Sequence, residues 1–95
     1  MKTKAFDKAD FLKTDEDIAA YITEALATGD AALITHALGV IARTRGMTRI
    51  ARETSLSRES LYRALSAEGN PEFLTVLKIM EALGLRLTAE RVTAE

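Results

Sequence analysis

Apolar side chains recur at helical spacing in five segments of this 95-residue chain. In the first segment, Ile18, Ile22 and Leu26 follow one another at every fourth position and so share one face of a helix. Glycine, serine and asparagine interrupt the pattern between segments, as expected for turns. The five predicted helices span residues 14–28, 31–45, 48–54, 57–66 and 72–83. The pattern therefore predicts an all-α fold.

Short polar residues mark the starts of the predicted helices. A Ser, Thr, Asp or Asn side chain at an N-cap accepts a hydrogen bond from a backbone N–H that has no partner within the helix. Asp17, three residues after Thr14, is placed for a reciprocal capping box. Pro71 is expected at the first position of the last helix, where its missing N–H costs nothing. The predicted N-caps are Thr14, Asp30, Thr48, Ser57 and Asn70.

The last helix and the tail after it favour self-association. Apolar residues cover nearly half the circumference of that helix, which is wider than one small core requires. Residues 85–90 alternate apolar and polar, which predicts a short C-terminal strand, and a lone strand leaves its backbone groups unpaired. We therefore expect a homodimer through residues 72–92, in which the strands of two chains pair. The alternative is a monomer with a central apolar helix and a frayed tail.

Charge is unevenly distributed along the chain. The net charge is −1 overall. Residues 43–66 nevertheless hold six arginines and only two glutamates, a local charge of +4, so the remainder carries −5. A basic patch on an acidic body can bind a polyanion with one face and a basic partner with another. The charge pattern is thus compatible with both nucleic acid and a basic protein as partners.

The stretch TRIARETSLSRESLYRALS, residues 48–66, has the pattern of a helix-turn-helix. Ala51 supplies the small residue that this geometry requires where the second helix crosses the first. Ser55 occupies the turn position that often has a left-handed backbone, for which glycine is better suited. The residues expected to face the core are Ile50, Leu56, Leu61 and Leu65, and those on the outer face are Arg58, Glu59, Tyr62, Arg63 and Ser66.

A helix-turn-helix binds duplex DNA by placing its second helix in the major groove. Arg58 and Arg63 could bind guanine edges or phosphates, and Tyr62 could contact a thymine methyl group or a phosphate. Arginines outside that helix would bind the DNA backbone, which adds affinity but no sequence information. The candidate DNA-binding residues are Thr48, Arg49, Ser57, Arg58, Ser60, Tyr62 and Arg63, with further phosphate contacts at Arg43, Arg45 and Arg52.

Several kinds of chemistry are disfavoured by what the sequence lacks. Without cysteine, no disulfide, thiol nucleophile or cysteine metal site can form. His36 is the single histidine, and its spacing to other residues offers no second metal ligand or catalytic partner. No apolar run approaches the roughly 20 residues of a membrane span, and the N-terminus lacks the apolar stretch of a signal peptide. We therefore expect a cytoplasmic protein that has no metal or cofactor and is not an enzyme.

The sequence MTRIARETSLSRESLYRALSAEGNPEFLTVLKIMEALGLRL, residues 47–87, resembles the addiction-module antidote proteins. These are helix-turn-helix antitoxins of the Xre, or lambda-repressor, class from bacterial type II toxin–antitoxin modules. The stretch DIAAYITEAL, residues 17–26, resembles the family as well, and the likeness covers residues 14–92.

This resemblance implies a compact lambda-repressor-like bundle of about five helices that binds operator DNA as a dimer. It also implies neutralisation of a small basic RelE/ParE-like ribonuclease toxin and repression of the operon that encodes the module. The groove-reading residues that it implies are Ser57, Arg58, Ser60, Tyr62 and Arg63, with Thr48 and Arg49 near phosphate.

No short motif marks the residues that would bind a toxin. Residues 1–13 are interpreted as a flexible N-terminal arm ahead of a helix-turn-helix domain over 14–92. Apolar residues of this arm could become ordered on a partner, and the acidic region that follows complements a basic protein. The candidate toxin-binding residues are Phe6, Phe11, Leu12 and Tyr21. The alternative is an arm without a function.

Two other functions fit the same sequence. A stand-alone phage-type transcriptional repressor would bind DNA without a toxin partner. A helical protein-interaction module would bind no DNA, and its arginines would meet only acidic protein. For the arginines themselves, the alternative is a solvated basic face in which Arg49 pairs with Glu53, and Arg58 pairs with Tyr62 or Glu59. Salt-dependent binding to duplex DNA separates the interaction module from the two DNA-binding functions.

Overall fold

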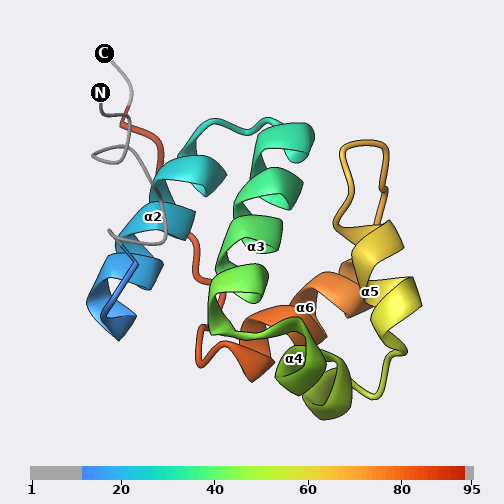
Figure 1. The fold of residues 1–95 in the computed structure, drawn as a ribbon. Coiled ribbons are helices and arrows are strands. Elements are labelled where there is room, and N and C mark those ends of the chain that lie inside the picture. Colours follow the sequence, from blue (N-terminus) through green and yellow to red (C-terminus); the bar gives the residue numbers. More distant parts are fainter. Residues whose placement is uncertain (1–11, 94–95) are drawn as a thin grey trace, which may run out of the picture.

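Five helices account for the regular secondary structure of residues 12–93, the part of the chain that the computed structural model describes (Figure 1). The predicted all-α class is confirmed, and within that range no strand is present. The helices are α2 (Asp15–Ala27), α3 (Ala31–Arg45), α4 (Met47–Thr54), α5 (Arg58–Ala64) and α6 (Phe73–Ala82). In Figure 1, α3 lies between α2 on one side and the pair formed by α4 and α5 on the other.

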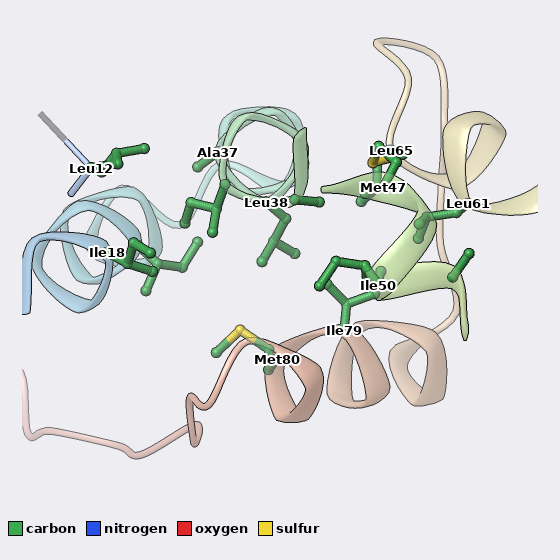
Figure 2. Close-up of a cluster of buried hydrophobic side chains, with 14 residues drawn as sticks. Leu12, Ile18, Ala37, Leu38, Met47, Ile50, Leu61, Leu65, Ile79 and Met80 are labelled. Atoms are coloured by element: carbon green, nitrogen blue, oxygen red, sulfur yellow. The ribbon is translucent and has the colours of Figure 1, made fainter. Parts of the chain in front are cut away.

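All five helices contribute to one apolar core (Figure 2). Ile50 of α4 and Leu61 of α5 are fully buried in the same cluster as Leu38 of α3 and Ile79 of α6. Burying a large aliphatic side chain contributes about 1.5–3 kcal/mol. Helices as short as α4 and α5 are not stable alone in water, so this core is what holds them in place.

One polar side chain is buried with the apolar ones. Thr54, in the last turn of α4, donates its hydroxyl hydrogen to the carbonyl of Ile50 at 2.8 Å. Among residues 12–93, no buried side-chain nitrogen or oxygen lacks a hydrogen-bond partner. The core therefore carries no unsatisfied polar side chain that would destabilise it.

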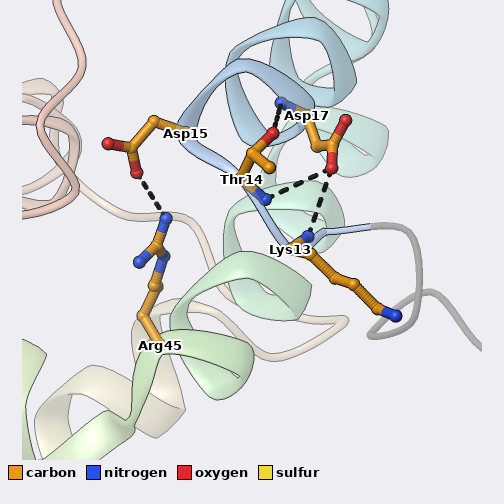
Figure 3. Close-up of polar contacts among 5 residues, drawn as sticks. All are labelled: Lys13, Thr14, Asp15, Asp17 and Arg45. Carbon is orange, nitrogen blue, oxygen red and sulfur yellow. Dashed lines mark hydrogen bonds and ion pairs between the residues drawn. The ribbon is translucent and has the colours of Figure 1, made fainter.

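Three N-caps are present at their predicted residues. Thr14 forms the capping box of α2: its hydroxyl accepts from the Asp17 N–H at 3.0 Å, and the Asp17 carboxylate accepts from the Thr14 N–H at 3.2 Å (Figure 3). Asp30 accepts hydrogen bonds from two N–H groups in the first turn of α3. Ser57 accepts from the N–H of Ser60 at 2.9 Å. These caps define the starts of α2, α3 and α5.

The predicted N-cap of α4 is wrong. This helix begins at Met47, with Gly46 at its N-cap and no side-chain cap bond, so Thr48 lies within its first turn. Gly46 has a positive φ of 105°, which lets the chain turn directly out of α3. Met47 is buried in the core. Tertiary packing of Met47, rather than a local cap, therefore decides where α4 begins.

The predicted start of α6 is also wrong. Glu72 is the N-cap, without a side-chain cap bond, and Phe73 is the first helical residue. Asn70 and Pro71 belong instead to the loop between α5 and α6. That loop begins with a turn in which the Gly69 N–H donates to a carbonyl just after α5. Because this turn packs against α5, α6 begins later in the sequence than predicted.

An ion pair closes the open end of the α2–α3 hairpin. Three residues, including Gly29 with a positive φ of 68°, connect the two helices, which pack against each other and therefore run antiparallel. At the other end of the hairpin, Arg45 in the last turn of α3 bonds to Asp15 in the first turn of α2 at 2.6 Å (Figure 3). Each charge also interacts favourably with the dipole of its own helix.

The C-terminal tail is neither helix nor strand over residues 85–93. Leu85 and Leu87 pack half-buried against the core, and the Leu85 N–H donates to the Met80 carbonyl at 2.8 Å. The predicted strand was expected to pair with a second chain, and in a single chain it has no strand beside it. The tail therefore packs against the core of its own chain through Leu85 and Leu87.

Gly69 is expected to be required for stability. A Cβ at this residue would collide with the carbonyl of Ala64 and would lie 2.6 Å from the carbonyl oxygen of Arg63. Backbone atoms cannot move aside as a flexible side chain does, so Gly69→Ala should cost about 3 kcal/mol.

Urea unfolding of Gly69→Ala and of a control, Gly29→Ala, measures this cost. Gly29 has a positive φ but open space around its Cβ position, so the control should lose only about 1 kcal/mol, from backbone strain. Equal losses in the two variants would show that crowding at Gly69 is not the cause.

Candidate nucleic-acid interface

A turn of three residues, 55–57, joins α4 to α5. Ser55 adopts the left-handed backbone that the sequence predicted there, with φ 63° and ψ 26°. The N–H of Leu56 donates to the carbonyl of Ala51 at 3.0 Å, which completes the C-terminal cap of α4. Ser57 then caps α5. Because the connection is short and hydrogen-bonded, the orientation of α5 on α4 is fixed.

The inner side of the pair formed by α4 and α5 is apolar, as predicted. Ile50, Leu61 and Leu65 are buried in the core, and Leu56 packs against it half-buried. Ala51, expected where the helices approach closely, is buried too. All the aliphatic side chains of the pair are thus used for packing, and its opposite side is left to solvent.

The outer face of α5 consists of exposed polar side chains, namely Arg58, Glu59, Tyr62 and Arg63, and the exposed Ser66 follows just beyond the end of the helix. Arg58 lies over the Tyr62 ring, 5.7 Å from its centroid, and donates to the Tyr62 hydroxyl at 3.5 Å. Arg63 lies 3.9 Å from the carboxylate of Glu59. Exposed pairs of this kind contribute only about 0–1 kcal/mol, so a ligand can replace them at small cost.

The arginines outside α5 are used in different ways. Arg49 pairs with Glu53 along α4 at 3.2 Å, as expected for a solvated basic face. Arg52 is exposed near the end of α4. Arg45 is bonded to Asp15, so this predicted phosphate contact also has a structural role that the sequence did not indicate.

Arg43 folds back along α3 toward Gly39. A Cβ on Gly39 would lie 3.3 Å from a guanidinium nitrogen of Arg43 and 3.3 Å from the Leu65 carbonyl oxygen. Gly39 is buried, so its missing side chain lets α3 approach the C-terminal end of α5 closely. Arg43 is exposed to solvent, and its side chain lies beside this close approach of α3 to α5.

The smaller predicted residues contribute unequally to this surface. Thr48 is exposed in the first turn of α4. Ser57 is exposed, but its hydroxyl already accepts the Ser60 N–H, and Ser60 itself is half-buried. Of the predicted DNA-binding residues on α5, the fold therefore leaves Arg58, Tyr62 and Arg63 exposed.

The predicted partner-binding residues lie away from α5. Tyr21 is half-buried on α2, which is separated from α5 by α3 (Figure 1). Leu12, expected to lie in a flexible arm, is only 5% exposed and belongs to the core, so its side chain offers no surface to a partner. Phe6 and Phe11 lie outside the described residues.

Two acidic residues pair with the arginines of the candidate interface, although neither was among the predicted DNA-binding residues. Glu59 lies in the first turn of α5, on its outer face, and its spacing of four residues from Arg63 was a signal that could have identified it. Asp15 engages Arg45 across 30 residues of sequence. No local pattern signals a pair so far apart in the chain.

The described residues hold no sign of a metal site. His36 is exposed on α3, and residues 12–93 bring together no group of three His, Cys, Asp or Glu side chains that could hold a metal ion. Over the same residues, no helix is both long and apolar enough to cross a membrane.

Comparison with known proteins assigns the class. A sequence model described as "Probable addiction module antidote protein" matches residues 2–91. The chain therefore belongs to this family of addiction module antidote proteins, as its resemblance predicted. An uncharacterised protein of Haemophilus influenzae is 48% identical over 88 residues, which cover 93% of this chain and 91% of that protein. No solved structure matches the chain.

The left-handed turn residue should respond to substitution by glycine. Ser55→Gly removes the steric cost of a left-handed backbone, about 1–2 kcal/mol, but adds the entropy cost of glycine, about 0.5–1 kcal/mol. We expect a net gain in the free energy of unfolding of about 0.5–1 kcal/mol by urea denaturation. Ser66→Gly, at a residue without a positive φ, should lose stability. A gain in both variants would contradict the explanation from strain.

Proposed function

We propose that this antidote protein is a DNA-binding antitoxin that neutralises a cognate toxin and represses its own operon. The observation that carries the proposal is the outer face of α5. Arg58, Tyr62 and Arg63 project there from a helix that Leu61 and Leu65 fix to the core. Membership of the antidote family supplies the expectation of a toxin.

In this proposal α4 and α5 are a helix-turn-helix, and α5 enters the major groove. That groove is wide enough for a helix, and an arginine can bind both acceptors of a guanine edge. Arg58 and Arg63 are the candidates for this contact. Arg49 and Arg52 of α4 would contact phosphates, which positions the protein without reading sequence. The charge of +4 over residues 43–66 supports attraction to the duplex.

The proposed toxin is a small basic protein of the RelE/ParE-like ribonuclease class. The first turn of α2 holds Asp15, Glu16 and Asp17, which complement a basic surface. We place the toxin contact on the part of the arm that precedes Leu12 and on α2. Leu12 itself belongs to the core, so the helix-turn-helix domain, predicted to span 14–92, includes it. Because α2 and α5 lie on opposite sides of α3, toxin and DNA could be bound at the same time. A cytoplasmic location follows from these two partners.

The proposed functional unit is a homodimer through residues 72–92. On α6, Phe73 and Leu74 are 68% and 60% exposed, and Leu77 is exposed beside them. The core thus leaves one side of this apolar helix uncovered. A second chain would cover it, could pair with the extended tail, and would present two copies of α5 to two half-sites on the DNA.

A stand-alone repressor is the second candidate, because nothing in the outer face of α5 requires a toxin. A small basic reading frame next to the gene, whose product is neutralised on co-expression with this chain, favours the antitoxin. Its absence, together with operator binding, favours the stand-alone repressor.

Arg63→Ala should weaken binding to the duplex upstream of the protein's own gene by about 1–3 kcal/mol if Arg63 reads a base. The measurement is a gel-shift titration at two salt concentrations, with an unrelated duplex for comparison. Arg63 is exposed and outside the core, so its variant should unfold at the wild-type temperature.

The matched control is Lys13→Ala, which removes one exposed positive charge at the start of α2 and should leave binding unchanged. Equal weakening of all duplexes by Arg63→Ala would make Arg63 a phosphate contact. Failure of the wild-type protein to bind any duplex at low salt would favour the protein-interaction module instead.

Leu74→Glu should convert the proposed dimer to a monomer, because it places a charge in an apolar contact. Sedimentation velocity at several protein concentrations measures the change. Leu33→Glu is the control, since Leu33 is also an exposed leucine, 49% accessible, but lies on α3. A wild-type protein that stays monomeric at every concentration would rule out the dimer.

A further inference from the structure

We propose that Glu59 determines the sequence specificity of the surface formed by α5, by requiring a cytosine at one position of the DNA site. This inference rests on the proposed DNA-binding function. Glu59 lies on the outer face of α5 together with Arg58, Tyr62 and Arg63. Its side chain is 87% exposed, so the carboxylate points to whatever the face binds.

Only two carboxylates occur within the basic stretch of residues 43–66, and they differ in how they are used. Glu53 accepts a hydrogen bond from the Arg49 Nε at 3.2 Å, and its side chain is 41% exposed. Glu59 lies 3.9 Å from Arg63, beyond hydrogen-bonding distance. The carboxylate of Glu53 is therefore held in a hydrogen-bonded ion pair, whereas that of Glu59 takes part only in a longer and more exposed ion pair with Arg63.

An exposed carboxylate on this face disfavours duplex DNA in general. Both strands together present about one negative charge per 1.7 Å of the DNA axis, and a carboxylate that loses its water without gaining a donor is destabilised further. Glu59 therefore weakens binding to every site that offers it no hydrogen-bond donor. Penalising the wrong ligands in this way is a recognised source of specificity.

Cytosine is the base that removes this penalty. Its N4 amino group donates in the major groove, and Glu is a natural acceptor for it. Adenine also presents an amino group, but the acceptor N7 lies beside it and would repel a carboxylate. The neighbouring Arg63 could at the same time bind guanine, so the two side chains together would select adjacent cytosine and guanine bases.

Glu59 also has a structural role that must be separated from this one. It lies in the first turn of α5, where a negative charge stabilises the helix. A purely structural Glu59 would affect thermal unfolding but not the preference among bases. The test therefore needs a readout of base preference alongside one of stability.

The experiment compares full-length wild type with Glu59→Gln and Glu53→Gln. Each duplex in a panel changes one base pair of the operator, and an unrelated duplex completes the panel. Wild type should prefer C·G at one position by about fivefold or more. In Glu59→Gln this preference should fall, the A·T duplex at that position should gain most, because Gln binds adenine, and the unrelated duplex should bind more tightly.

Glu53→Gln makes the same change of charge on α4 and should keep the wild-type order of base preferences. Equal effects of the two substitutions on every duplex would overturn the proposal, because only bulk charge would then matter. A lower unfolding temperature for Glu59→Gln with an unchanged base profile would overturn it as well. A wild-type protein that binds no duplex selectively would instead refute the proposed function, and the role of Glu59 with it.

Discussion

The burial of Ile50 and Leu61 against the longer helices is the interaction on which the rest of the structure depends. Neither α4, with eight residues, nor α5, with seven, could persist alone in water. Their apolar residues complete a core that α3 and α6 begin. As a result, core packing and the short hydrogen-bonded turn at Ser55 together fix the direction of α5, and with it the position of its arginines.

Local signals in the sequence predicted most of the helix positions. Thr14, Asp30 and Ser57 act as caps because a cap needs only its own side chain and the next turn of backbone. The left-handed backbone at Ser55 was expected from the place of the turn in the helix-turn-helix pattern, although glycine suits that conformation better than serine. The starts of α4 and α6 were not predictable, since the burial of Met47 and the close packing after α5 depend on residues elsewhere in the chain.

The candidate site shows the same division between local and distant effects. Pairs four residues apart, such as Arg49 with Glu53 and Arg63 with Glu59, follow from helical spacing and could be read from the sequence. The bond from Arg45 to Asp15 and the burial of Leu12 depend on how α2 folds onto α3. The family could be assigned from the sequence alone, because the residues of its motif form an almost unbroken run around the turn between α4 and α5.

The separation of the outer face of α5 from its inner face also bears on how such proteins diversify. Residues such as Arg58 and Arg63 are exposed and lie outside the buried core, so replacing them leaves the packing of that core in place. Substitutions at these positions can accumulate with little risk of unfolding. A lineage built on this scaffold can therefore change the chemistry of this outer face by single steps, each of which passes through a folded protein.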